Sequence, residues 1–183
     1  SKLLFSLFNK RLLYKNIFEL INTNYTIYDL QNIYPNCKKI SLIYDSKLKS
    51  DKKRKGHLNI LLGSVLSESK LMTLKNECLI MQRAIERFKI THYIPHPRNR
   101  VKLISDNSII ELTDKRISEE VILEMKNRYK SINVYGIYST ALLNLAQVPD
   151  IFITNLDCDH FSRSTNLKDV FTSLGIKTID LLN

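Results

Sequence analysis

The chain contains no tryptophan and has few of the residues that interrupt or cross-link a fold. Only 4 glycines and 4 prolines occur among 183 residues, which excludes low-complexity and linker-rich classes of protein. The cysteines, Cys37, Cys78 and Cys158, are widely separated and lack the paired spacing of metal sites. We therefore expect free thiols in a reducing compartment.

Long hydrophobic runs are also missing. No uninterrupted apolar run approaches the roughly 20 residues that a membrane-spanning helix needs, and no segment resembles a signal peptide. We therefore expect a protein that is soluble or peripheral to a membrane. There is no internal repeat. With 44% hydrophobic residues, the chain can bury the core of about one domain and has sequence left over for an extension.

The positive charge is concentrated in the first third of the chain. Residues 1–56 hold 12 Lys and Arg against 4 Asp and Glu, a net of +8, whereas residues 57–183 hold 16 against 14, a net of +2. We predict a basic helical extension and connector over 1–56, and a separate domain over 57–183. Within the extension, residues 3–11 are typical of a basic amphipathic helix, which either lies on an anionic membrane surface or packs on another domain or subunit.

Strand-like and helix-like segments alternate along the domain. Short apolar strands that alternate with helices predict an α/β fold, a Rossmann-like parallel sheet with helices on both faces. Ligands bind such sheets at the carboxyl ends of the strands. The predicted strands are 39–44, 57–63, 90–94, 108–111, 132–137, 150–154 and 176–180, and the predicted helices are 2–21, 71–88, 117–130, 139–147 and 166–173.

A histidine between two prolines ends one of these strands. Pro95 and Pro97 leave His96 little backbone freedom, because proline fixes its own φ and restricts the residue before it. An imidazole held at a strand end can donate a proton or a positive charge to a phosphate, and Arg98 follows closely. A rigid turn with a surface histidine is the alternative.

A second strand end carries two hydroxyl side chains. The apolar run 132–138 leads into helical sequence, with Ser139 and Thr140 at the helix start. Hydroxyls and unpaired N–H groups at that point can hold an anion. An ordinary serine cap is the alternative.

Three segments together resemble the successive motifs of glycosyltransferase family 52, which holds bacterial lipooligosaccharide sialyltransferases. They are Asn59–Glu68, Tyr93–Arg98 (Tyr-Ile-Pro-His-Pro-Arg) and Tyr138–Leu145, and Tyr25–Tyr28 is similar to the region ahead of the first motif. The resemblance implies a GT-B enzyme that transfers sialic acid from CMP-sialic acid to a galactose-terminated glycan, with inversion and without a metal or other cofactor. It also implies a homodimer. We expect a cytoplasmic protein, which the basic helix would hold at the cytoplasmic face of the bacterial inner membrane.

The resemblance assigns roles to the two strand-end sites. His96 with Pro97 resembles the His-Pro motif of the family, whose imidazole contacts the donor phosphate. Ser139 and Thr140 resemble the paired hydroxyls that bind the same phosphate. We interpret His96 as the catalytic residue, acting in its charged form on the departing phosphate.

Further substrate-binding residues follow from the same resemblance. Glu119 resembles the acidic residue that holds the ribose hydroxyls, with Glu120 as a near alternative. Gly63 resembles the glycine that lets the backbone approach the nucleotide. The family usually has Gln at the next position, where this chain has Ser64, so recognition of the base near Ser64 departs from the family pattern.

One part of the family pattern is missing. The catalytic base of the family is an aspartate in an Asp-Asp-Gly type motif of the N-terminal domain, and Asp45 does not match it. The chain begins with Ser1 directly in helical sequence. We therefore expect that an upstream half is absent and that these residues form the donor-binding half.

Other readings have less support in the sequence. Asp157-Cys-Asp-His160 is compact, but we interpret it as a polar loop and assign no metal. The basic run 52–55 would suit a nucleic-acid backbone, yet it leaves both strand-end sites unexplained, so we expect no nucleic-acid partner. A family relative that uses another nucleotide sugar, for glucosyl transfer, is the remaining alternative.

Overall fold

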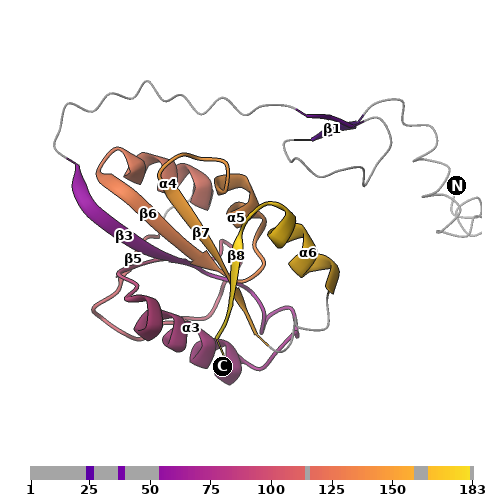
Figure 1. Ribbon diagram of the computed structural model, residues 1–183. Helices are drawn as coiled ribbons and strands as arrows, with labels where there is room; N and C mark the ends of the chain where they lie inside the picture. The colour runs from indigo at the N-terminus through magenta and orange to yellow at the C-terminus, as the bar shows by residue number, and fades with distance from the viewer. Residues whose placement is uncertain (1–23, 27–36, 40–53, 114–115, 159–164, 182–183) are drawn as a thin grey trace, which may run out of the picture. The chain divides into compact units, whose positions relative to one another are not determined.

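The computed structural model describes residues 24–26, 37–39, 54–113, 116–158 and 165–181 (Figure 1). The chain divides into two compact units, residues 1–43 and 44–183. In the first, strands β1 (Asn24–Thr26) and β2 (Cys37–Lys39) pair in parallel. The predicted helix 2–21 and residues 40–44 of a predicted strand lie outside the described residues. The predicted boundary near residue 56 stays a prediction.

The second unit contains a six-stranded sheet in which every described pair of neighbours is parallel. The strand order is β5-β4-β3-β6-β7-β8. The first three strands run outward from the centre in one direction and the last three in the other, which is the doubly wound order of Rossmann folds. The strands are β3 (Lys55–Leu62), β4 (His92–Ile94), β5 (Ile110–Glu111), β6 (Tyr129–Gly136), β7 (Ile151–Asp157) and β8 (Lys177–Asp180).

Helices cover both faces of this sheet, as predicted. Figure 1 shows α4, α5 and α6 on one side of the strands and α3 on the other. Each face has its own buried cluster of apolar side chains, since alternate residues of β3 point to opposite sides: Ile60 belongs to one cluster and Leu61 to the other. The helices are α3 (Leu74–Phe88), α4 (Ser118–Lys126), α5 (Thr140–Leu145) and α6 (Thr165–Ser173).

Several element boundaries differ from the predicted ones for local reasons. Helix α3 begins only at Leu74, because the Thr73 hydroxyl caps it by accepting a hydrogen bond from the Asn76 N–H at 3.2 Å. Helix α4 ends at Lys126, four residues early, because residues from Tyr129 onward join the sheet opposite Lys55. Strand β7 continues to Asp157, so its last residues are strand and not loop.

The described helices are short. None of them is both long enough and apolar enough to cross a membrane.

Candidate functional site

The two halves of the sheet diverge between β3 and β6, and a small hollow of about 40 Å³ lies there. Its walls come from four strand or helix ends: Gly63 after β3, the segment 94–97 at the end of β4, Arg116 and Ser118 at the start of α4, and Ser139 before α5. In open α/β sheets this switch point is where ligands bind, because the diverging connections leave a crevice at the carboxyl strand ends. The structure thus brings four of the predicted site residues, Gly63, His96, Pro97 and Ser139, to one place.

His96 is held in a tight turn above this hollow. Its carbonyl accepts a hydrogen bond from the Asn99 N–H at 2.8 Å, and its Nδ1 accepts one from the Arg98 N–H at 3.1 Å. Because Nδ1 is an acceptor, the proton of the neutral ring is on Nε2. The half-buried imidazole therefore presents an N–H donor through Nε2.

The surroundings of His96 change the pKa of its imidazole. Partial burial lowers the pKa of His96 below its usual 6.5, and the Arg98 guanidinium lowers it further, while the Glu68 carboxylate acts in the opposite direction. In the free protein at neutral pH the imidazole is thus mainly neutral. A charged His96 requires an added anion, such as a phosphate, to restore the proton.

This lowered pKa predicts a pH dependence of stability. A histidine whose folded pKa lies below its unfolded value binds fewer protons when folded, so its contribution to stability is complete above pH 6.5 and is lost as the pH falls through the folded pKa. NMR titration of the His96 ring should give a pKa below 6.5, and addition of a nucleoside monophosphate should raise it. A free-protein pKa at or above 6.5 would contradict the geometry described for the ring.

Gly63 fixes the distance between the two strand ends. Its N–H donates to the Ile94 carbonyl at 2.7 Å. A Cβ atom at this position would lie 2.6 Å from the His96 backbone nitrogen and 2.6 Å from the Tyr93 hydroxyl oxygen. The absence of a side chain at Gly63 therefore lets the His96 turn approach β3.

Ser64 faces the interior. Its hydroxyl donates to the carboxylate of Glu77 at 2.8 Å, and Glu77 also accepts from the N–H groups of Leu66 at 3.1 Å and Ser67 at 2.8 Å. Glu77 is only 1% exposed. This carboxylate organises the turn that follows β3, and the Ser64 hydroxyl is part of that support.

Ser139 caps helix α5 at the edge of the hollow. Its hydroxyl oxygen accepts from the Ala141 N–H at 3.3 Å, which leaves its own proton for donation, while Thr140 is exposed beside it. The preceding residue, Tyr138, has a φ of 40°, which is rare for a bulky side chain. The strained turn is held by Asn155 on β7, which is fully buried and accepts from the Tyr138 N–H at 2.8 Å.

Glu119 connects two helices behind the hollow. Its carboxylate accepts from the Asn144 amide of α5 at 2.8 Å and from the Ser118 hydroxyl at 3.0 Å, and Ser118 itself lines the hollow. Glu120 is exposed. Contact between Glu119 and a ribose stays a prediction, as does contact between Pro97, which also lines the hollow, and a ligand.

The segment 157–160 was predicted to be a polar loop, but its first two residues are buried. Asp157 ends the strand, is 4% exposed and forms an ion pair with Lys168 of α6, and Cys158 is 1% exposed. Asp159 and His160 lie outside the described residues. Across the described ranges, no three His, Cys, Asp or Glu side chains are grouped as metal ligands would be.

Three residues of the site were missed from the sequence. Glu77 carries the clearest signal, because it lies on the buried face of α3 with Met81 and Ala84 at helical spacing. Arg116 lines the hollow while paired with Glu124 at 3.0 Å, and nothing in the local pattern marks it. Asn155 directly follows the predicted strand 150–154, and only the fold brings it to Tyr138.

These features define a Rossmann-like α/β domain with a ligand crevice at its switch point. The chain belongs to glycosyltransferase family 52, whose pattern matches residues 2–160. It is 30% identical over 166 residues to the CMP-N-acetylneuraminate:beta-galactoside alpha-2,3-sialyltransferase of Pasteurella multocida strain Pm70. That match covers 88% of this chain and 50% of the relative, so the chain spans about half the length of the relative that it matches.

Proposed function

We propose that the chain is the donor-binding half of a GT-B sialyltransferase. In this proposal it binds CMP-sialic acid, and a second half completes an enzyme that transfers the sugar to a galactose-terminated lipooligosaccharide or capsular glycan. The observation that carries the proposal is the convergence of Gly63, His96 and Ser139 on one switch-point hollow in a family 52 chain. The activity in the name of the Pasteurella relative supports the choice of donor and of a galactoside acceptor.

The chemistry that these residues can perform is stabilisation of a departing phosphate. In an inverting transfer, the acceptor oxygen bonds to the sialyl carbon, the bond to the CMP oxygen breaks, and the acceptor proton passes to a base that we place in the other half. Negative charge grows on the phosphate as the bond breaks. His96, Ser139 and Arg116 line the hollow. In this proposal the His96 Nε2–H, the Ser139 hydroxyl and the Arg116 guanidinium stabilise that charge.

A metal ion is dispensable in this proposal. A single phosphate carries less charge than a diphosphate, so hydrogen-bond donors and one cationic side chain can offset it. A charged His96 adds to this effect, because a phosphate beside the ring favours the imidazolium.

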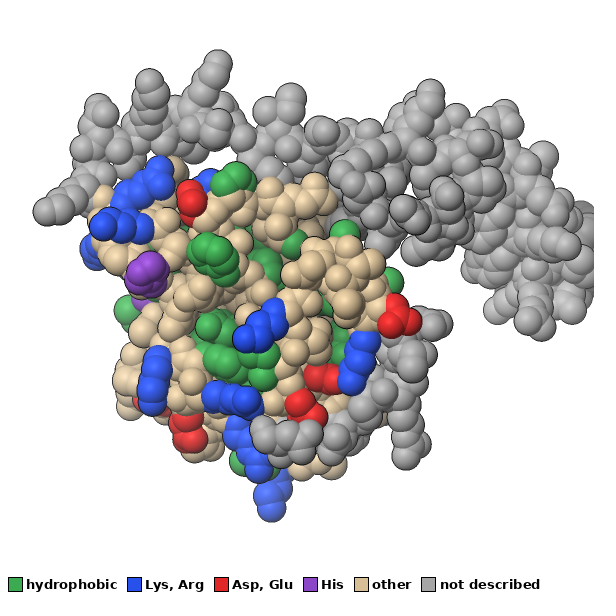
Figure 2. Space-filling model, in the orientation of Figure 1, with side chains coloured by type: hydrophobic (Ala, Val, Ile, Leu, Met, Phe, Trp, Pro, Cys, Tyr) green, Lys and Arg blue, Asp and Glu red, His purple; other side chains and the backbone are tan. Residues whose placement is uncertain are grey.

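The face of the described domain in Figure 2 gives little support to the nucleic-acid alternative. Figure 2 shows Lys and Arg side chains spread over this face, with acidic side chains between them, and not gathered into one stripe. Nucleic-acid binders concentrate positive charge along the path of the backbone. The homodimer that the resemblance implies and the peripheral membrane contact expected from the basic helix remain part of the proposal.

Calorimetric titration with CMP, UDP and AMP, without added metal, tests the proposal. We expect CMP to bind more tightly than UDP or AMP. Replacing His96 with alanine should weaken CMP binding by about tenfold, because it removes one hydrogen bond to a charged phosphate. Tighter binding of UDP would favour the glucosyl-transfer alternative, and stronger salt-sensitive binding to unrelated DNA would favour the nucleic-acid one.

His57 supplies a matched control for that experiment. It is an exposed histidine near the opposite end of β3, where its ring nitrogen is hydrogen-bonded to the Ser131 hydroxyl. The His57→Ala variant should bind CMP as the parent chain does. Equal CMP affinity in the parent, His57→Ala and His96→Ala chains would refute the role assigned to His96.

A further inference from the structure

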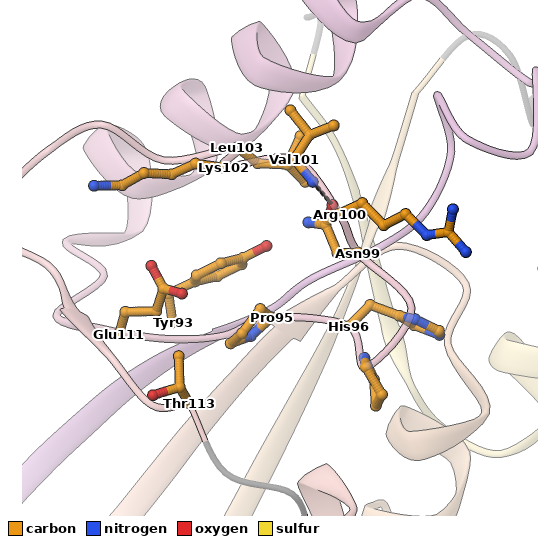
Figure 3. A pocket seen from close by; sticks show the side chains of 11 residues that line it. Tyr93, Pro95, His96, Asn99, Arg100, Val101, Lys102, Leu103, Glu111 and Thr113 are labelled. Carbon is orange, nitrogen blue, oxygen red and sulfur yellow. Dashed lines mark hydrogen bonds between the residues drawn. The ribbon is translucent and has the colours of Figure 1, made fainter.

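In the turn that carries His96, four successive N–H groups, those of residues 98–101, each donate a hydrogen bond. Three of them donate to acceptors within the turn: Arg98 to the His96 Nδ1, Asn99 to the His96 carbonyl, and Val101 to the Asn99 Oδ1 at 3.0 Å. Figure 3 shows the last of these bonds as a dashed line. The fourth, the Arg100 N–H, donates at 2.7 Å to the carboxylate of Glu68, which lies outside the turn. Glu68 therefore connects the His96 turn to another part of the fold.

The part of the fold that carries Glu68 is itself held in place. Two backbone hydrogen bonds, each of 2.9 Å, close turns within the loop 64–71 that follows β3. The buried Glu77 carboxylate accepts three further hydrogen bonds from the start of the same loop. The Arg100 N–H is thus bonded to a loop whose backbone is fixed relative to β3 and α3.

The Glu68 carboxylate also acts on the charge of the His96 ring. Burial lowers the pKa of His96 most and the Arg98 guanidinium lowers it further, whereas the Glu68 carboxylate raises it. Other charged side chains line the hollow at the switch point or a larger neighbouring hollow that His96 also lines: Arg100, Lys102, Glu111 and Arg116. Glu68 thus offsets part of the positive charge around the ring.

We propose that Glu68 is a positioning residue for His96, because its hydrogen bond to the Arg100 N–H holds the turn that places the imidazole at the edge of the small hollow. Without this bond the Arg100 N–H would bond to water, and the turn would lose its connection to the loop after β3. This inference rests on the proposed function, in which the imidazole contacts the donor phosphate.

Two substitutions separate the hydrogen bond from the charge. Glu68→Gln removes the negative charge but keeps an oxygen that can accept from the Arg100 N–H, whereas Glu68→Ala removes both. Glu68→Ala should therefore bind CMP about fivefold more weakly than Glu68→Gln, which corresponds to the loss of one hydrogen bond. NMR titration should give a lower pKa for His96 in both variants than in the parent chain, because the carboxylate that favours the charged ring is gone.

The same pair of variants in a His96→Ala chain tests whether Glu68 acts through the imidazole. The difference in CMP affinity between the two should then fall to less than about twofold, since coupled residues are not additive. A fivefold difference that persists without the imidazole would overturn the positioning role. Equal CMP affinity of Glu68→Gln and Glu68→Ala in the chain with His96 would overturn it too, as would a His96 pKa that Glu68→Gln leaves unchanged.

Glu86→Gln is the matched control, because Glu86 is an exposed carboxylate on α3 that accepts from the Gln82 amide at 3.0 Å. It should leave both the CMP affinity and the pKa of His96 unchanged. If the parent chain does not bind CMP, the proposed function fails, and hydrogen exchange of the Arg100 amide then decides the role of Glu68. Faster exchange in Glu68→Ala than in Glu68→Gln would support that role, and equal exchange would overturn it.

Discussion

Replacing Glu77 with alanine should lower the free energy of unfolding by about 3 to 4 kcal/mol, one of the largest effects expected from a single side chain in this domain. The carboxylate accepts hydrogen bonds from one hydroxyl and two backbone N–H groups in a buried place. Its loss leaves those three donors without an acceptor and opens a cavity beneath the turn after β3. Urea unfolding followed by circular dichroism measures the change.

Two further variants separate the interaction from simple truncation. Glu77→Gln keeps the shape of the side chain but turns one acceptor into a donor. It should therefore also lower the free energy of unfolding, by at least several tenths of the decrease expected for Glu77→Ala. Glu86→Ala removes an exposed carboxylate from the same helix and should change stability by no more than about 0.5 kcal/mol. Equal unfolding midpoints for Glu77→Ala and Glu86→Ala would show that the buried hydrogen bonds contribute nothing.

The regular part of the fold could be predicted because its signals are local. Apolar runs such as 57–63 and 132–137 mark buried parallel strands, and the segments between them have helical composition, so alternation alone predicts the parallel sheet. The boundaries depend on partners that lie far away in sequence. Tyr129 becomes strand because Lys55 pairs with it, and no nearby residue signals this.

The site could be predicted where the backbone itself is constrained. Two prolines fix His96, and a serine at a helix start marks Ser139, so both positions stand out in the sequence. The polar groups that support them do not. Asn155 holds a turn that lies 17 residues before it in the sequence, and Glu77 holds one that lies 10 to 13 residues before it. The function of both side chains depends on burial, which a single sequence does not display.

The charge of His96 could not be predicted for a similar reason. The sequence shows an imidazole next to Arg98, and a phosphate site suggests an imidazolium. Burial and the Arg98 guanidinium together lower the pKa of His96 instead. The charged form of His96 beside a departing phosphate stays a prediction.

Replacing Gly63 with alanine should weaken CMP binding by tenfold or more and destabilise the domain by about 1 to 3 kcal/mol, because the new methyl group overlaps the His96 turn. The added Cβ would lie 2.6 Å from the His96 backbone nitrogen, so the turn has to move away from β3. The hydrogen bond from the Gly63 N–H to the Ile94 carbonyl, at 2.7 Å, is then stretched or lost. Because His96 lines the hollow, the proposed contact between its imidazole and the donor phosphate weakens as well. Gly56→Ala is the control, since nothing lies within 4 Å of a Cβ there and both changes stiffen the unfolded chain equally. Thermal unfolding and CMP titration of the two variants measure the difference. If Gly63→Ala and Gly56→Ala gave the same stability and the same CMP affinity, the close approach of the two strand ends would have no role in holding the His96 turn.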